Sequence, residues 1–255
     1  MIKVFTKTQL LLFILVFGLH FTSHAQERRI IPLNEHFFAI EAGGGEYVFN
    51  NVVSFSEEGE MIEKTYSLEN KLISIKKSVL EDTPEKMPLW EQEQHFNLDG
   101  DLEFTRIKYK NEDGNYTKII RNGNLILDLK CKSFDCKGFY ITDDQQMVEC
   151  DRDVFESGFP TVKTWSKLLN KHLRFPEVAK QPGSMFKIWI GFKIDESGEM
   201  IENAVMNKNL IHPSISKEVE RIITKYNGKF MPALDFDGNP ITSWFYITLI
   251  FRGAI

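Results

Sequence analysis

The sequence predicts an α+β protein built from two domains. An N-terminal antiparallel β-meander, residues 26–148, precedes a C-terminal domain, residues 149–255, in which two helices cover one face of a three-stranded antiparallel sheet. Between residues 47 and 130, short β-prone runs alternate with Asn-Gly, Asp-Gly and acid-rich turn sequences, which are strong hairpin signals. After residue 150, two stretches show the apolar period of helices, and other stretches alternate apolar and polar residues as half-buried strands do.

The first 25 residues are expected to lie outside this fold. Lys3 and Lys7 precede an apolar run at residues 10–19, and the stretch closes on small residues at Ala25. A basic start, a short apolar core and a small-residue end are typical of a secretory signal peptide. We therefore expect cleavage between Ala25 and Gln26 and a periplasmic or secreted protein. An uncleaved inner-membrane anchor is the alternative.

The meander strands are expected between successive turn signals. Tight hairpin turns need positive φ, which Gly and Asn adopt most readily. The pentapeptide Gly-Glu-Met-Ile-Glu occurs twice, at residues 59–63 and 198–202, each time after an acid-rich turn. Because the flanking patterns differ, we interpret the repeat as one hairpin device used twice and not as a domain duplication. The predicted strands lie at residues 47–55, 61–68, 72–80, 90–97, 102–110, 116–121 and 125–130.

The three cysteines, Cys131, Cys136 and Cys150, predict one disulfide and one remaining thiol in an exported protein. Cys131–Cys136 closes a short loop and is the preferred pair, with Cys136–Cys150 as the competitor. No His lies between Cys131 and Cys150, so no zinc site is expected. The formal net charge of −5 argues against non-specific nucleic-acid binding, which requires a basic surface.

The C-terminal domain is predicted to begin with a helix over residues 164–175, with Thr164 as its N-cap and Pro176 after its end. A second helix is expected over residues 212–226, where Pro213 suits the first turn. Strands are expected at residues 185–194, 200–208 and 244–252. Each helix carries one apolar stripe, composed of Trp165, Leu168, Leu169, His172 and Leu173 in the first and of Ile215, Val219, Ile222, Ile223 and Tyr226 in the second.

Four motifs in order give this domain its family resemblance. They are "WSKLLNKHLRFPEVAK", "FKIWIGFKIDESGEMIENAVM", "HPSISKEVERII" and "KFMPALDFDGNPITSWFYITLIF". Over residues 149–252 the sequence resembles the C-terminal domain of TonB proteins, in the form common among Bacteroidota. In the N-terminal half, "FSEEGE" and "FNLDGD" share a layout, Phe-x-x-acid-Gly-acid, that resembles the hairpin repeats of YwqK- and MORN-type proteins.

The TonB resemblance implies a module that pairs an extended peptide with an exposed sheet edge. It points to the last strand, whose row Phe245, Ile247, Leu249 and Phe251 is expected to face the core. The expected partner-binding residues on the opposite face are Trp244, Tyr246, Thr248 and Arg252. The implied partner is a protein or peptide, with a segment of a TonB-dependent outer-membrane transporter as the specific example; pairing of two copies through sheet edges is an alternative.

Two other functions are weighed against this one. An anchored energy transducer would need a retained membrane anchor and a Pro-rich linker, and this chain has a signal-like start and a meander in their place. A cryptic periplasmic enzyme would need catalytic groups that converge from distant positions, because no His lies near a Cys, Ser or carboxylate at a diagnostic spacing. We therefore expect no enzymatic activity, and no catalytic residue, metal, cofactor or small-molecule substrate is predicted.

Overall fold

The computed structural model describes residues 28–40, 47–81, 88–132 and 135–253 of the chain. The predicted signal peptide, residues 1–25, lies outside these residues. Within them, no helix is both long enough and apolar enough to cross a membrane.

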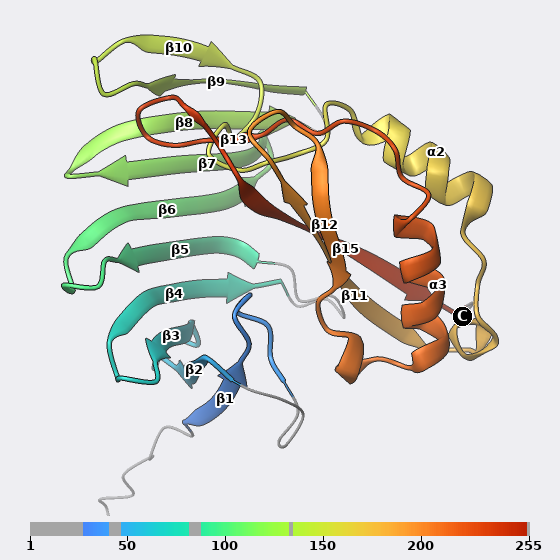
Figure 1. The fold of residues 1–255 in the computed structure, drawn as a ribbon. Coiled ribbons are helices and arrows are strands. Elements are labelled where there is room, and N and C mark those ends of the chain that lie inside the picture. The colour runs from blue at the N-terminus through green and yellow to red at the C-terminus, as the bar shows by residue number, and fades with distance from the viewer. Residues whose placement is uncertain (1–27, 41–46, 82–87, 133–134, 254–255) are drawn as a thin grey trace, which may run out of the picture.

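The N-terminal part is a single antiparallel sheet of ten strands that follow one another in chain order (Figure 1). Every strand pairs with its neighbour in sequence, so the sheet is an antiparallel meander without crossovers. The strands are β1 (Arg29–Leu33), β2 (Phe49–Phe55), β3 (Met61–Ser67), β4 (Leu72–Leu80), β5 (Pro88–Phe96), β6 (Leu102–Asn111), β7 (Gly114–Arg121), β8 (Asn124–Lys132), β9 (Asp135–Ile141) and β10 (Met147–Cys150).

The predicted α+β class is wrong, because strands dominate the chain. The structure is 51% strand, with the ten-stranded sheet as its main feature and only two α-helices among the described residues. The difference comes from strands that the sequence patterns did not indicate. β1 contains Pro32 and β9 contains Gly138, residues that weaken a strand signal. With these strands the sheet extends to Cys150, and β10 crosses the predicted domain boundary between residues 148 and 149.

One turn design recurs at both copies of the repeated pentapeptide. Gly59 and Gly198 have φ values of 84° and 83°. In each turn the N–H of the glycine donates to the carbonyl three residues earlier, from Ser56 or Asp195. The side chain of that first residue accepts a hydrogen bond from the N–H four residues later. Turns at Asn97–Asp101 and Asp235–Asn239 have the same bonds. The interpretation as a shared hairpin device is confirmed.

The C-terminal part contains a three-stranded antiparallel sheet in the order β12-β11-β15. It lies between the meander and the helices, which cover its other face (Figure 1). The elements in order are α2 (Val162–His172), η1 (Glu177–Lys180), β11 (Met185–Ile194), β12 (Met200–Val205), η2 (Lys208–Leu210), α3 (Pro213–Ile223), β13 (Ala233–Leu234), β14 (Pro240–Ile241) and β15 (Ser243–Arg252). β13 and β14 form a separate two-stranded ribbon.

The main hydrophobic core lies between this sheet and the helices. The alternating row of β11 that includes Ile188, Ile190 and Phe192 is fully buried there. The predicted row of β15 and the predicted stripe of α3 pack into the same core, as expected from their periods. Helix α2 begins earlier than predicted. Its N-cap is Thr161, whose side chain accepts from the N–H of Lys163, and Thr164 lies within the helix.

A second, smaller core joins the two parts. Ile119, Leu127 and Leu129 are buried on the face of β7 and β8 that Phe155 and Phe236 cover. The same face of β3 to β6 carries mostly charged and polar side chains. One half of the inner meander face is therefore apolar and filled, while the other half is polar.

Candidate binding site

Strand β15 forms one edge of the three-stranded sheet. It pairs with β11 along its whole length and with no other strand in the described part of the chain. At its far end the N–H of Gly253 donates to the carbonyl of Ser184, which extends the ladder by one more pair. An unpaired edge of ten residues is long for a protein surface, because edge strands are normally short or protected.

The direction of the free backbone groups follows from the ladder. The carbonyl of Trp189 accepts from the N–H of Met206, and the N–H of Trp189 donates to the Asn207 side chain, so both groups of Trp189 point toward β12. Backbone groups alternate along a strand, so those of Ile190, one residue on, point toward β15 and bond its partner Ile247. By the same alternation the N–H groups of Tyr246, Thr248 and Ile250 point away from β11. No group in the described residues accepts from them.

The four predicted partner-binding residues lie on one face of β15, but in two different environments. Trp244 and Tyr246 are half-buried and stack with ring centroids 6.1 Å apart. Thr248 and Arg252 are exposed, and Ile250 on the same face retains 36% of its surface. Only the second half of the strand is therefore open on both its edge and this face.

A short N-terminal segment covers the first half. After β1, the Asn34 side chain accepts hydrogen bonds from the N–H groups of His36 and Phe38, which folds the segment back on itself. The His36 ring contacts Trp244 at 4.6 Å, and its Nδ1 lies 3.4 Å from the Tyr246 hydroxyl. Phe38 packs against Tyr246 at 5.3 Å. These contacts connect the meander to the C-terminal sheet through aromatic rings.

Beside this contact lies a cavity of about 360 Å³ between the meander and the sheet. Its volume falls within the ~300–1,000 Å³ of typical ligand sites. Trp189 and Tyr246 line one side, and His36 and Phe38 line the end. Two adjacent rows of the meander contribute the remaining polar residues, namely Asn51, Thr65, Ser74 and His95 in one row and Glu63, Lys76 and Glu93 in the next.

The charged row at the cavity is ordered by cross-strand pairing. Glu63, Lys76, Glu93 and Arg106 lie directly opposite one another on β3 to β6. Burial alone would raise the pKa of Glu93, but the hydrogen bond from His95 at 3.2 Å and the nearby cations lower that pKa to about 2. Burial alone would lower the pKa of Lys76, but the Glu91 carboxylate at 2.8 Å raises it above its usual value. Both groups therefore keep their charges at neutral pH.

Tyr246 is the cavity residue that also belongs to the open strand. Burial, together with the Glu35 carboxylate, raises the pKa of its hydroxyl to about 12. The phenol is therefore neutral at physiological pH and can donate or accept a hydrogen bond. Lys187 on β11 places its ammonium 5.2 Å from the Trp189 ring centroid, within the range of a cation–π contact.

A network of ion pairs joins the two parts, and within it the Arg106–Asp153 pair is largely buried. Arg106 on β6 pairs with Asp153 at 3.6 Å and with Glu156, both in the connection between the parts. Lys108 also contacts Glu156, at 3.2 Å. Arg152 in the same connection donates to the carbonyl of Pro232 at 2.8 Å. This network sets the position of the C-terminal sheet over the polar half of the meander.

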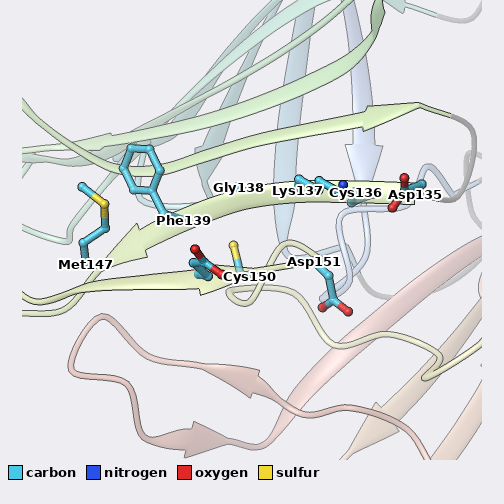
Figure 2. Close-up of a pocket in the computed structure, with 9 residues that line it drawn as sticks. Asp135, Cys136, Lys137, Gly138, Phe139, Met147, Cys150 and Asp151 are labelled. Atoms are coloured by element: carbon cyan, nitrogen blue, oxygen red, sulfur yellow. The ribbon is translucent and has the colours of Figure 1, made fainter.

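A second hollow, of about 870 Å³, runs along β9 and β10 at the edge of the large sheet (Figure 2). Asp135, Lys137, Glu149 and Asp151 line it and are exposed, so it is a shallow surface feature. The Cys150 thiol lies here, and burial raises its pKa, which keeps it protonated and poorly nucleophilic. We find no set of converging polar groups in this hollow.

The preferred disulfide is confirmed. Cys131 and Cys136 are bonded across the hairpin of β8 and β9, and Cys150 is the free thiol. The competing pair Cys136–Cys150 is therefore excluded in this structure. Among the residues that the structure describes, no group of three or more His, Cys, Asp or Glu side chains is arranged to hold a metal ion.

The polar cavity was not predicted from the sequence. Its strongest signal is the run "EQEQH" at residues 91–95, in which two carboxylates and a histidine recur at every second position of one strand. Such spacing places them on one face of the sheet. Their partners Glu63 and Lys76 join them only through strand register, which the sequence does not show.

Comparisons with known proteins give no relatives for this chain: no protein-family model, no curated protein and no solved structure matches it. The resemblances to TonB C-terminal domains and to hairpin-repeat proteins therefore stay predictions.

Proposed function

We propose that this chain is an exported protein-interaction module that binds an extended peptide segment along the outer edge of β15. The observation that carries the proposal is the row of outward N–H groups from Tyr246 to Ile250, which have no acceptor among the described residues. A peptide that adds a strand to such an edge gains main-chain hydrogen bonds, and its side chains provide selectivity.

The exposed half of β15 is the expected starting point for the peptide. Thr248 and Ile250 are exposed there, whereas Trp244 and Tyr246 lie under the His36 segment. β12 presents the opposite edge of the same sheet but is six residues long. The longer β15 edge offers more main-chain hydrogen bonds to a peptide.

Export is part of the proposal. The Cys131–Cys136 disulfide supports it, because disulfides persist mainly in oxidising compartments such as the periplasm. Intact-mass measurement of the native protein tests it: a chain that begins at Gln26 supports export with cleavage, and a chain that retains Met1 contradicts cleavage. For the partner, we propose a segment of an outer-membrane TonB-dependent transporter as the first candidate to test.

Edge binding can be tested with proline, which removes one N–H. Because the N–H of Thr248 points away from β11, Thr248→Pro removes a donor for the peptide and leaves the β11 ladder intact. Asn203→Pro on β12 is the matched control. Its neighbours Glu202 and Ala204 pair with Lys193 and Gly191, the β11 residues that bond β12, so the N–H of Asn203 also points outward.

The ligand for this test is a peptide of about 12 residues selected from a random display library on the purified chain. Loss of one main-chain hydrogen bond with the added ring clash should weaken binding about tenfold, or ~1.4 kcal/mol. We expect this loss by calorimetry for Thr248→Pro and wild-type affinity for Asn203→Pro. Since only alternate peptide amides bond an edge, N-methylation should abolish binding at one alternate set and be tolerated at the other. Wild-type affinity of Thr248→Pro, or equal tolerance of both methylation patterns, would rule out the β15 edge.

A further inference from the structure

The cavity between the meander and the C-terminal sheet has a chemistry of its own, independent of the open edge of β15. Its meander side presents carboxylate and amide oxygens, and its other side presents aromatic rings. We propose that it binds an ammonium or guanidinium group carried on a short aliphatic chain. Three features of the cavity favour such a ligand: an unpaired acceptor, the balance of charges and the aromatic wall.

The unpaired acceptor belongs to Asn51 on β2. Its Nδ2 donates to Glu63 Oε1 at 3.0 Å, and because a carboxylate accepts only, this bond fixes which way the amide faces. The opposite atom, Oδ1, is buried and has no hydrogen-bond partner. Asn51 lines the cavity and is only 8% exposed. A buried acceptor without a donor costs about 1–3 kcal/mol, so a ligand whose donor reached Oδ1 would remove that penalty.

The charges around the cavity favour a cation. Among the residues that line it, two carboxylates, Glu63 and Glu93, face one lysine, Lys76. Glu91, which pairs with Lys76, adds a third carboxylate beside the cavity. Lys76 is engaged by Glu91 at 2.8 Å. Glu63 also lines the cavity, and no cation lies within 4 Å of its carboxylate among the described residues. An anionic ligand would meet repulsion here, and a cation would balance the excess charge.

The aromatic wall suits the aliphatic chain of such a ligand. Phe38 contacts Trp189 at 5.7 Å and Tyr246 at 5.3 Å, and all three rings line the cavity. Aromatic faces attract ammonium and guanidinium groups and also cover methylene groups. A purely inorganic cation would leave this surface unused, which is why we assign an organic cation.

The same chemical group can come from two sources. It can be a free aliphatic amine or guanidine, or it can be the side chain of Lys or Arg in a peptide. Tyr246 lies on β15 and also lines the cavity. A peptide bound along β15 would therefore pass close enough to place a Lys or Arg side chain in the cavity. The experiment therefore has one arm for each source.

The first arm is calorimetric titration of the purified chain with n-butylguanidinium and with n-butylurea, its neutral isostere. We expect binding of the cation only. Hydrogen bonds to charged groups contribute ~1.5–3 kcal/mol, so Glu63→Gln should weaken binding by about ten- to a hundredfold. Glu57→Gln, at an exposed turn carboxylate, is the matched control and should bind as the wild type does. Trp189→Leu should weaken binding about two- to fivefold through the lost cation–π contact.

The second arm uses a library-selected peptide that contains Arg, together with its citrulline analogue. A loss of affinity with citrulline that disappears in Glu63→Gln assigns the site to a peptide side chain. Equal affinity of the two peptides, with n-butylguanidinium still bound, assigns the site to a free cation. The proposal is overturned if n-butylurea binds as well as n-butylguanidinium, or if Glu63→Gln and Glu57→Gln behave alike. Neither result affects the Thr248→Pro test of the β15 edge, so the two proposals can fail separately.

Discussion

The ion pairs at the junction give the most direct test of how the two parts are held together. Arg106→Met keeps the aliphatic bulk of the side chain and removes its charge. The Arg106 side chain is 15% exposed and Asp153 is 13% exposed, so the variant leaves a nearly buried carboxylate without its cation. Breaking a buried pair from one side costs about 3–5 kcal/mol.

The structure places the expected cost at the lower end of this range. Glu156 is 42% exposed and retains Lys108 at 3.2 Å, so its share is that of a surface pair, about 0–1 kcal/mol. Arg106 Nε and Asp153 Oδ2 are also buried without hydrogen-bond partners, so the intact pair is imperfect. We therefore expect Arg106→Met to lower the free energy of unfolding by about 3 kcal/mol.

Urea unfolding at pH 7 measures this change, and a loss of 3 kcal/mol should lower the midpoint by about 1–2 M. Lys180→Met is the control: it breaks the pair with Glu177, both of whose members are exposed, and should cost less than ~1 kcal/mol. Adding Asp153→Asn to Arg106→Met should recover part of the loss, because the uncompensated charge is then gone. Asp153 is not an uncompensated buried charge in the variant if Arg106→Met costs no more than Lys180→Met, or if the double variant is no more stable than the single one.

Three further predictions concern the turns, the charged row and the disulfide. Gly59→Ala should lower the free energy of unfolding by about 1 kcal/mol, because of its positive φ alone. Gly198→Ala should cost at least 2 kcal/mol more in thermal unfolding, because its new Cβ would also collide with a backbone carbonyl. Equal costs would contradict the packing of the second turn. The pKa of Glu93 is lowered to about 2, so the stability that the ionised carboxylate contributes is present above pH ~4.5 and is lost as the pH falls toward 2. Glu93→Gln should flatten the dependence of the free energy of unfolding in urea on pH in that window. An unchanged pH dependence would contradict the lowered pKa. Replacing both cysteines of the Cys131–Cys136 disulfide with Ala should lower the free energy of unfolding by about 2 kcal/mol, the loop-closure value for so short a loop. An equal loss in Cys150→Ala would refute a specific role for the bond.

Local features of this fold could be predicted well where a short stretch of sequence contains all the residues that stabilise them. The turn at Gly59 could be predicted, because Ser, Asn or Asp at the first position and Gly at the fourth satisfy the hydrogen bonds of that turn by themselves. The buried stripe of α3 and the core row of β15 follow from their periods in the same way. What these signals could not predict was the extent of the sheet. β1 and β9 have weak strand character, and pairing with neighbours stabilises them.

The candidate site was predicted only in part, and strand register explains the difference. The edge role of β15 depends on its order in the sheet, which was expected only from the resemblance to TonB C-terminal domains. The cavity depends on Glu63, Lys76 and Glu93 being directly opposite one another. β3 and β4 shift register after Thr65, and β5 and β6 shift after His95, so spacing along the sequence does not give these pairs. The N-terminal segment that covers Tyr246 and the cavity beside it both depend on contacts between segments far apart in the sequence. Neither could therefore be predicted from one segment alone.

The division of the inner meander face gives the strongest argument that its polar half has a function. Where Phe155 and Phe236 cover β7 and β8, the sheet presents a filled apolar core. Over β3 to β5, the sheet instead presents charges to aromatic rings across a cavity. Apolar residues at these positions would pack against Trp189 at no desolvation cost, and replacing buried ion pairs with well-packed apolar side chains is often neutral or stabilising. Stability therefore does not explain the charged row, while a bound cation would make use of both its carboxylates and the facing rings.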